Sequence, residues 1–241
     1  MMTNTNNTIA NTFNNFNNGI ILLSGGLDSA ASLAVCIKHF KIGLALTFDY
    51  GQNAAQQEIS SAKKIAEYYG IEHKVLKLDW MKSLYTAEIP LINSDMHPSE
   101  IGQELSDKVW IPNRNALFIN IAAAFADSES NDFDVIIIGA NREEAQNFPD
   151  NSQEFVQAAN RCLEYSTKNK VKVFSPLIDF DKPDILKLAF ENNAPLEYIY
   201  SCYQGTKVHC GQCESCLHLK HALEGFDKNT ARKYIKMYFG E

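Results

Sequence analysis

The sequence has little positive charge, no long apolar run and few cysteines outside one short segment. Its 241 residues carry 22 Lys and Arg against 29 Asp and Glu, which gives a formal net charge of −7. The chain therefore lacks the overall positive field that supplies most non-specific affinity for nucleic acid, and we expect no stable complex with DNA or RNA. No apolar run approaches the roughly 18–20 residues of a membrane-spanning helix, so we expect no membrane span. A nucleotide-sized substrate is compatible with this composition.

The N-terminal segment, residues 1–18, contains no Lys or Arg and is crowded with Asn and Thr. It lacks both the charged start and the apolar core of a secretory signal peptide. We predict a disordered tail over these residues and a cytoplasmic protein. A reducing compartment also suits the cysteines, because Cys36 and Cys162 lie in apolar, helix-like contexts that favour buried free thiols.

From Gly19 onward, short apolar or β-branched runs alternate with helical segments, a pattern typical of a parallel sheet covered on both faces. We predict five strands, over 20–23, 44–48, 74–78, 135–138 and 171–174. We predict helices over 29–39, 54–69, 115–127, 152–167 and 183–191, and two shorter helical segments over 217–224 and 230–238. The expected fold is an α/β, doubly wound, mainly parallel five-stranded sheet over 19–200, followed by a small helical subdomain over 201–241.

Two segments carry further expectations. The stretch 116–125 is apolar nearly all round, which predicts a helix that is buried on every side. Residues 79–110 mix prolines, a histidine and scattered acids without a sustained period. Because a loop of that length in a compact domain is often functional, we predict that it covers a site.

The most informative segment, residues 20–29, is an apolar strand that ends in Ser24-Gly25-Gly26 and passes directly into a helix. Adjacent glycines can adopt positive φ and let the backbone approach a phosphate, while the free amides and dipole of the helix start favour negative charge. Ser24 and Ser29 add hydroxyl groups, and Asp28 is suited either to cap the helix or to hold Mg²⁺. A tight connection without a ligand is the alternative interpretation.

Two common nucleotide-binding loops are absent from this position and from the rest of the chain. The chain has neither G-x-x-x-x-G-K-[ST] nor G-x-G-x-x-G. Ordinary γ-phosphate ATPases and dinucleotide oxidoreductases therefore both lose support.

Four of the six cysteines, Cys202, Cys210, Cys213 and Cys216, fall within fifteen residues. Two overlapping C-x-x-C steps and a fourth cysteine are typical of a tetrahedral Zn²⁺ site. Four thiolates fill the coordination sphere, so we predict one structural zinc ion per chain rather than a catalytic one. Unpaired or redox-active cysteines are the alternative, and three nearby histidines offer substitute ligands: His209, His218 and His221.

The string Ser-Gly-Gly-Leu-Asp-Ser at 24–29 resembles the pyrophosphate loop of the N-type ATP pyrophosphatases. Together with the cysteine cluster, it makes the sequence similar to the 7-cyano-7-deazaguanine synthase family of the queuosine pathway. The likeness runs from about residue 19 to residue 236. It includes further short segments in the family's order, at 48–52, 111–115, 138–141, 148–155 and 201–203.

This resemblance implies an adenine nucleotide alpha hydrolase-like fold and an ATP-dependent, AMP-forming carbon–nitrogen ligase. The family converts 7-carboxy-7-deazaguanine and ammonia to 7-cyano-7-deazaguanine through an adenylated carboxylate and then an adenylated amide. Adenylation supplies the good leaving group that a carboxylate lacks. The implied cofactors are ATP, Mg²⁺ and a structural Zn²⁺, and the implied assembly is a homodimer.

Residue roles follow from matching the chain to the family's segments. The loop assigns eight residues to ATP: Leu23, Ser24, Gly25, Gly26, Leu27, Asp28, Ser29 and Ala30. We take Asp28, Ser24 and Arg114 as catalytic, with Asp28 also a candidate Mg²⁺ ligand. Arg114 is the candidate cation for phosphate or for the substrate carboxylate, because a guanidinium can bind an anion bidentately. A salt bridge at a helix start is its alternative role.

Seven residues are candidate contacts of the deazapurine substrate: Tyr50, Gln52, Arg114, Asn115, Phe148, Asp150 and Tyr203. The three aromatic side chains are suited to stack on the substrate ring or to fill the core. Asp150 is suited to accept hydrogen bonds from a guanine-like edge or to cap the following helix, and the sequence leaves both roles open.

Two dipeptides depart from the family's pattern. Asn53-Ala54 stand where many members carry Arg-His, and Asn151-Ser152 stand where many carry Cys-Arg. We interpret them as variation with the same substrate. The alternative is a changed reaction that stops at the amide or joins deazaguanine to another amine, such as a protein N-terminus. A zinc-containing tRNA-modifying or RNA-binding protein is a third hypothesis, because lysines lie near the cysteine cluster.

Overall fold

The computed structural model describes residues 13–84, 91, 110–128 and 132–240. Its centre is a sheet of five parallel strands in the order β3-β2-β1-β4-β5. The strands are β1 (Asn18–Leu22), β2 (Lys41–Asp49), β3 (Glu72–Lys77), β4 (Val135–Ile137) and β5 (Lys172–Phe174). The predicted five-stranded parallel sheet is confirmed, and each observed strand overlaps its predicted range.

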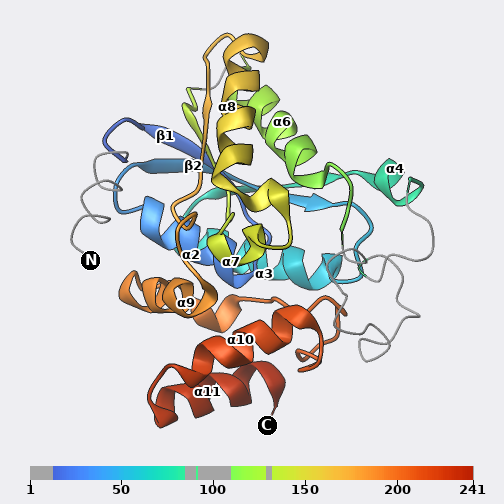
Figure 1. Cartoon of the computed structure of the whole chain (residues 1–241), viewed down its shortest axis with the longest axis vertical. Helices are drawn as coiled ribbons and strands as arrows, with labels where there is room; N and C mark the ends of the chain where they lie inside the picture. Colours follow the sequence, from blue (N-terminus) through green and yellow to red (C-terminus); the bar gives the residue numbers. More distant parts are fainter. Residues whose placement is uncertain (1–12, 85–90, 92–109, 129–131, 241) are drawn as a thin grey trace.

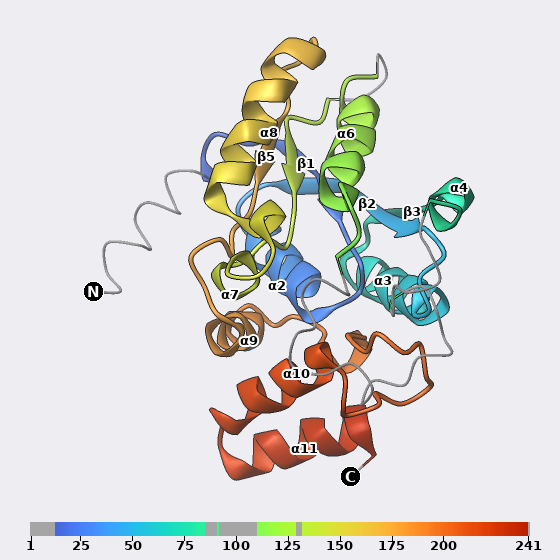
Figure 2. The same cartoon turned by 45° about the vertical axis from the view of Figure 1, so that its right-hand side comes forward.

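Helices cover both faces of this sheet (Figures 1 and 2). Adjacent residues of a strand point to opposite faces, so Ile21 packs in the core under α2 while Ile20 packs in the core under α6. The doubly wound arrangement is therefore confirmed. One layer contains α2 (Leu27–Cys36), α3 (Ala55–Tyr69) and α9 (Lys182–Glu191), and the other contains α6 (Arg114–Ala126) and α8 (Gln153–Ser166). Short helices lie in the connections: α4 (Asp79–Lys82), α7 (Arg142–Ala145), η2 (Pro149–Asn151) and η3 (Leu196–Tyr198).

The burial of the strands follows their place in the sheet. The inner strand β4 reads Val-Ile-Ile and is buried throughout, as expected for a parallel strand with helices on both faces. The edge strand β3 exposes Glu72, Lys74 and Lys77 to solvent. Charged side chains on an edge discourage pairing with another chain, so the sequence of β3 suits its outer position.

The C-terminal helices α10 (Glu214–Glu224) and α11 (Lys228–Phe239) pack beside α9, on the side away from the sheet (Figure 1). Their buried side chains Leu219 and Leu223 belong to the same continuous hydrophobic core as Leu186 of α9 and Leu33 of α2. The predicted division near residue 200 thus separates elements that share one core.

The predicted disordered tail is wrong for residues 13–18. Phe13 is only 3% exposed, and its ring stacks on His39 with the ring centroids 4.1 Å apart. The Asp134 carboxylate accepts hydrogen bonds from the backbone amides of Asn17 (2.8 Å) and Asn18 (3.2 Å). Composition alone missed this order because the phenylalanines and the distant Asp134 supply partners that an Asn-rich stretch lacks by itself. Residues 1–12 lie outside the described part of the chain.

Two predictions of burial are also wrong. Cys162 is exposed on α8, while Cys36 is fully buried and burial raises the pKa of its thiol. Helix α6 exposes Asn120 and Ala124, because it packs on the sheet and α8 from one side only. None of the described helices is long and apolar enough to cross a membrane.

Candidate active site

A cavity of about 310 Å³ opens at the carboxyl ends of β1, β2 and β4. The chain winds outward from β1 to β3 on one side and continues through β4 and β5 on the other, so the strand order reverses between β1 and β4. Ligands of open α/β sheets bind in the crevice outside the strand ends at such a reversal. The wall of this cavity includes twelve of the predicted ATP and substrate residues: Leu23, Ser24, Gly26, Leu27, Asp28, Ser29, Tyr50, Arg114, Asn115, Phe148, Asp150 and Tyr203.

The glycine loop forms the floor of one end of this cavity. Gly25 has φ +83°, and a Cβ there would lie 2.7 Å from the Cβ of Ser61, so both the conformation and the space require glycine. Gly26 is extended and begins α2. The Ser24 hydroxyl lies 3.2 Å from the Ser29 hydroxyl and accepts from the Gly26 amide at 3.3 Å. The loop thus gathers two hydroxyls and the first amides of a helix around one point, which suits an anion.

Lys182 brings a cation to the same end of the cavity. Its ammonium lies 2.5 Å from Asp28 Oδ2 and 2.6 Å from Glu144 Oε1. Burial alone would lower the pKa of Lys182, but the two carboxylates outweigh it and hold that pKa above its usual range. Burial raises the pKa of Asp28 to about 6, although Lys182 acts in the opposite direction. One ammonium therefore compensates two carboxylates only in part.

The second carboxylate oxygen of Asp28 differs from the first in its surroundings. Oδ1 of Asp28 is buried and lacks a partner among the described residues. A buried acceptor without a partner is costly unless a ligand or ion completes it. Carboxylate oxygens are the ligands that Mg²⁺ prefers, so Asp28 fits the role of a metal ligand better than that of a helix cap. The N-cap residue of α2 is Gly26.

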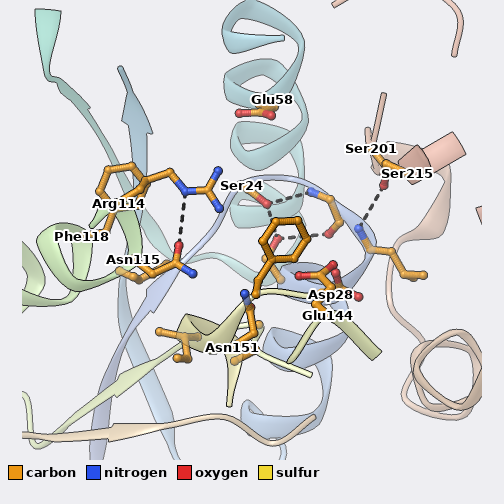
Figure 3. A pocket seen from close by; sticks show the side chains of 18 of the residues that line it. Ser24, Asp28, Glu58, Arg114, Asn115, Phe118, Glu144, Asn151, Ser201 and Ser215 are labelled. Atoms are coloured by element: carbon orange, nitrogen blue, oxygen red, sulfur yellow. Dashed lines mark hydrogen bonds between the residues drawn. The ribbon is translucent and has the colours of Figure 1, made fainter. Parts of the chain in front are cut away.

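Arg114 begins α6 and faces the loop from the opposite side to Ser201 and Ser215 (Figure 3). Its Nη1 lies 3.3 Å from the Tyr50 hydroxyl, and its Nε donates to Asn115 Oδ1 at 3.3 Å. Among the described residues, no carboxylate lies within 4 Å of the guanidinium. The predicted alternative of a helix-start salt bridge therefore has no support there, and Arg114 keeps donors for an anion in the cavity.

The aromatic candidates differ in their surroundings. Phe148 lies parallel to Trp110 with centroids 6.2 Å apart, a spacing wider than direct contact between rings. Tyr203 also lines the cavity, and burial holds the pKa of its hydroxyl well above the usual range. Tyr50 is only 6% exposed and packs against Phe118 with centroids 5.6 Å apart. Phe148 and Tyr203 are therefore better placed than Tyr50 to offer a ring face to a ligand.

The sequence left two roles open for Asp150, that of a helix cap and that of a substrate contact, and the structure gives the first to Ser152. The N-cap of α8 is Ser152, whose hydroxyl accepts from the Phe155 amide at 3.1 Å. Asp150 instead lines the cavity, where Asn151 Nδ2 donates to its Oδ1 at 3.3 Å. Burial raises the pKa of Asp150, with Arg114 acting against it. The cap role belongs to Ser152, and Asp150 is free to meet a ligand.

Gln52 does not line the cavity, contrary to the predicted substrate contact. Its Nε2 donates to the Phe48 carbonyl at 3.0 Å and to Glu58 Oε2 at 2.7 Å, while its Oε1 accepts from the Tyr50 amide at 2.9 Å. Every polar atom of the side chain has an internal partner. Gln52 therefore supports Glu58, which does line the cavity. Gly25 and Ala30, two of the predicted ATP residues, also lie outside the cavity wall.

Sequence reasoning missed several polar residues of the wall: Glu58, Glu144, Lys182, Ser201, Glu214, Ser215 and His218. Lys182 carried one usable signal, because a lysine at the first position of a helix opposes the helix dipole and needs a separate reason. The long segment 79–110 contributes Leu91 and Trp110 to the wall. Residues 79–84, which include α4, are not part of the wall, and residues 85–90 and 92–109 lie outside the described part of the chain.

The four cysteines converge beside the cavity. Their sulfur atoms all lie within 4.8 Å of one another, and Cys202, Cys213 and Cys216 are buried. Backbone amides donate toward the sulfurs, from Cys210 to Cys202 at 3.3 Å and from Cys213 to Cys210 at 3.3 Å. Four thiolates at this spacing, stabilised by amides, fit a tetrahedral metal ion. Among the described residues, no histidine joins this group.

Asn53-Ala54, one of the two dipeptides that depart from the family pattern, lies away from the cavity. Asn53 and Ala54 pack beside Gly205, whose φ is +68°. A Cβ on Gly205 would lie 2.2 Å from the Asn53 carbonyl oxygen. The two segments therefore pack backbone to backbone at this point, between the start of α3 and the cysteine-rich turn.

Comparison with known proteins places this geometry in a family. A family model described as "Queuosine biosynthesis protein QueC" matches residues 18–227. The 7-cyano-7-deazaguanine synthase of Methanosarcina barkeri is 44% identical over 85% of this chain and 93% of its own length. That of Carboxydothermus hydrogenoformans is 47% identical over 86% of this chain and 98% of its own length.

A solved structure agrees with the fold. The NMN synthetase from Francisella tularensis matches with a TM-score of 0.51 at 17% identity, over 98% of this chain and 92% of that chain. This likeness concerns the fold alone, and it agrees with the adenine nucleotide alpha hydrolase-like fold that the resemblance implied. With the family model spanning most of the sequence, the chain belongs to the QueC family of queuosine biosynthesis proteins.

Proposed function

We propose that this chain converts 7-carboxy-7-deazaguanine and ammonia to 7-cyano-7-deazaguanine at the expense of ATP, as a carbon–nitrogen ligase. The observation that carries the proposal is that the Ser24-Gly25-Gly26 loop and Arg114 meet at one cavity. That cavity lies in a chain 44% and 47% identical to proteins named for this product. An anion-binding loop and a separate guanidinium suit a reaction that must join ATP to a carboxylate.

The chemistry follows in two activations. A substrate carboxylate oxygen attacks the α-phosphorus of ATP, pyrophosphate leaves, and ammonia then displaces AMP to form the amide. The amide oxygen attacks a second ATP in the same way, and loss of AMP and of both amide N–H protons leaves the nitrile. The protein's contribution is to hold two anions together and neutralise phosphate charge, which is a matter of positioning and electrostatics.

The loop end of the cavity is the proposed phosphate site. The Ser24 and Ser29 hydroxyls and the first amides of α2 supply donors without adding charge. The Lys182 ammonium lies at the loop, where it pairs with Asp28, and it would move from this carboxylate toward a bound phosphate. Asp28 would hold Mg²⁺ through its unpartnered oxygen, and the ion would supply further neutralisation of the phosphates. The four cysteines would hold Zn²⁺, with a structural role.

The opposite end is the proposed site of the deazapurine. Arg114 would bind its carboxylate, and Asn115 would support Arg114 through the bond to Nε. Asp150 would accept hydrogen bonds from the guanine-like edge, and Phe148 and Tyr203 would contact the ring. Free ammonia as nitrogen donor and a homodimer belong to the same proposal.

The proposal is tested with purified protein, 7-carboxy-7-deazaguanine, ATP, Mg²⁺ and nitrogen-15 ammonium. We expect mass spectrometry to show nitrogen-15 in the nitrile, with AMP and pyrophosphate as co-products. Formation of the amide alone, or of an adduct with another amine, would show that the chain uses the same activation for a different end product. Absence of any AMP would overturn the assignment.

Ser152→Ala tests whether the departure from the family pattern at Asn151-Ser152 affects the substrate that the enzyme accepts. Because Ser152 caps α8 and does not line the cavity, we expect a loss of about 1 kcal/mol of stability, or about 2–4 °C in Tm. The KM for the deazapurine should stay at the wild-type value. Thermal unfolding and steady-state kinetics on the same preparation decide this, and a raised KM would place Ser152 at the substrate.

A further inference from the structure

The segment 198–202 connects the glycine loop to the cysteine cluster. The Tyr200 amide donates to the Gly25 carbonyl at 2.8 Å, and the Ser61 hydroxyl donates to the same carbonyl at 2.9 Å. The Ser201 hydroxyl accepts from the Leu27 amide at 3.4 Å. Ser201 lies across the loop from Arg114 (Figure 3). The loop is therefore held from outside by residues that precede the first cysteine of the cluster.

The far end of this segment is fixed within the cluster. Cys202 follows Ser201 directly, and its sulfur accepts from the Cys210 amide at 3.3 Å. His209, which precedes Cys210, accepts from the Ser201 amide through Nε2 at 3.1 Å. Its ring is buried and packs beside that of Tyr200, with centroids 4.8 Å apart. Ser201 thus has its amide tied to the cysteine-rich turn and its hydroxyl beside the phosphate loop.

These contacts determine how the loop presents its amides. In a trans peptide the carbonyl and the following N–H point in opposite directions. Two donors hold the Gly25 carbonyl away from the cavity, so the Gly26 N–H is turned toward Ser24 Oγ, on the cavity side. Without those donors, the glycines would be free to rotate, because glycine restricts its backbone least of all residues.

We propose that the metal-bound cysteine cluster positions the phosphate loop, with Ser201 as the positioning residue that connects them. The cluster then has a role in substrate binding as well as in folding the C-terminal helices. A metal ion would fix Cys202, and the short step to Ser201 would pass that constraint to Gly25 and Leu27. This inference rests on the proposed function, because it takes the loop as the site that binds ATP.

Ser201→Ala separates positioning from folding, because it leaves all four cysteines intact. Loss of one neutral hydrogen bond predicts a KM for ATP raised by about 3- to 10-fold, with a smaller change in kcat and in the KM for the deazapurine. Ser201→Thr keeps the hydroxyl and should restore most of the ATP affinity. Hydrogen exchange should speed up in peptides covering residues 23–30, while zinc content and Tm stay near wild type. Ser60→Ala, an exposed position on α3, is the matched control and should match the wild type.

The link to the metal is tested by measuring ATP affinity before and after chelation. We expect chelation to weaken ATP binding in the wild type, and to weaken it less in Ser201→Ala, since that variant has already lost the connection. If chelation unfolds the sheet, the inference is tested only by the ATP affinities of the zinc-loaded Ser201 variants. Unchanged ATP affinity in zinc-loaded Ser201→Ala would overturn the inference, and so would equal effects of chelation on a folded wild type and variant. A wild type that binds no ATP at all would instead overturn the proposed function.

Discussion

Asp28→Asn should lower AMP formation by about 10³-fold, because it removes the charge that the proposed Mg²⁺ site needs at the phosphates. Asp28 belongs to the loop and binds Lys182 through Oδ2, while its Oδ1 has no partner among the described residues. Asn keeps the size of the side chain and one acceptor oxygen, so the cavity wall stays in place. The assay is pyrophosphate and AMP release at saturating deazapurine, compared with Asp179→Asn, which changes an exposed carboxylate outside the cavity.

The same variant should remain folded. Burial raises the pKa of Asp28 from 3.8 to about 6, so ionising this carboxyl opposes folding. That cost is fully present above pH 6 and disappears as the pH falls from about 6 to about 3.8. Removing the charge therefore leaves Tm near the wild-type value, and Lys182 keeps Glu144 as its partner. For the same reason the wild type should lose activity as the pH falls below about 6. Normal turnover by Asp28→Asn would show that the loop binds something other than a metal–phosphate complex.

Cys213→Ser should strip the chain of most of its zinc and lower Tm by roughly 8–16 °C. Structural zinc contributes roughly 10–16 kcal/mol of apparent binding free energy in small units, and losing about 4 kcal/mol of it suffices for this shift. Cys213 is 6% exposed and directly precedes α10, so loss of the metal also releases the start of this helix from the cysteine cluster. Metal analysis and thermal unfolding measure both effects.

Cys162→Ser is the matched control for this experiment, because Cys162 is an exposed free thiol far from the cluster in sequence. It should keep one zinc per chain and the wild-type Tm. If Cys213→Ser also kept its full zinc content, the four cysteines would not form the metal site that their spacing predicts.

The features that could be predicted from the sequence are those whose residues are neighbours in the chain. The loop at 24–29 and the cluster at 202–216 each lie in one short segment. The structure places all of that loop except Gly25 at the cavity and brings the four cysteine sulfurs within 4.8 Å of one another. The strands were also legible, since buried parallel strands read as continuous apolar runs. Chain order and local chemistry were sufficient for these features.

The partners of Asp28 could not be predicted in the same way. Glu144 and Lys182 are more than one hundred residues away, and only the sheet order brings α7 and the start of α9 beside the loop. Gln52 failed as a substrate contact for a related reason. Its match to a family segment predicted a substrate contact, but its hydrogen bonds to Phe48 and Glu58 point its side chain into the protein and away from the cavity.

The cavity wall draws on segments from residue 22 to residue 219, from both helical layers and from the C-terminal extension. No fragment of the chain carries the whole wall, so the binding site exists only when distant parts of the sequence are folded together. A ligand that fills it binds the native state and not the unfolded chain, and mass action then shifts the folding equilibrium of the whole protein. Nucleotide binding and the global stability of the protein are therefore thermodynamically linked.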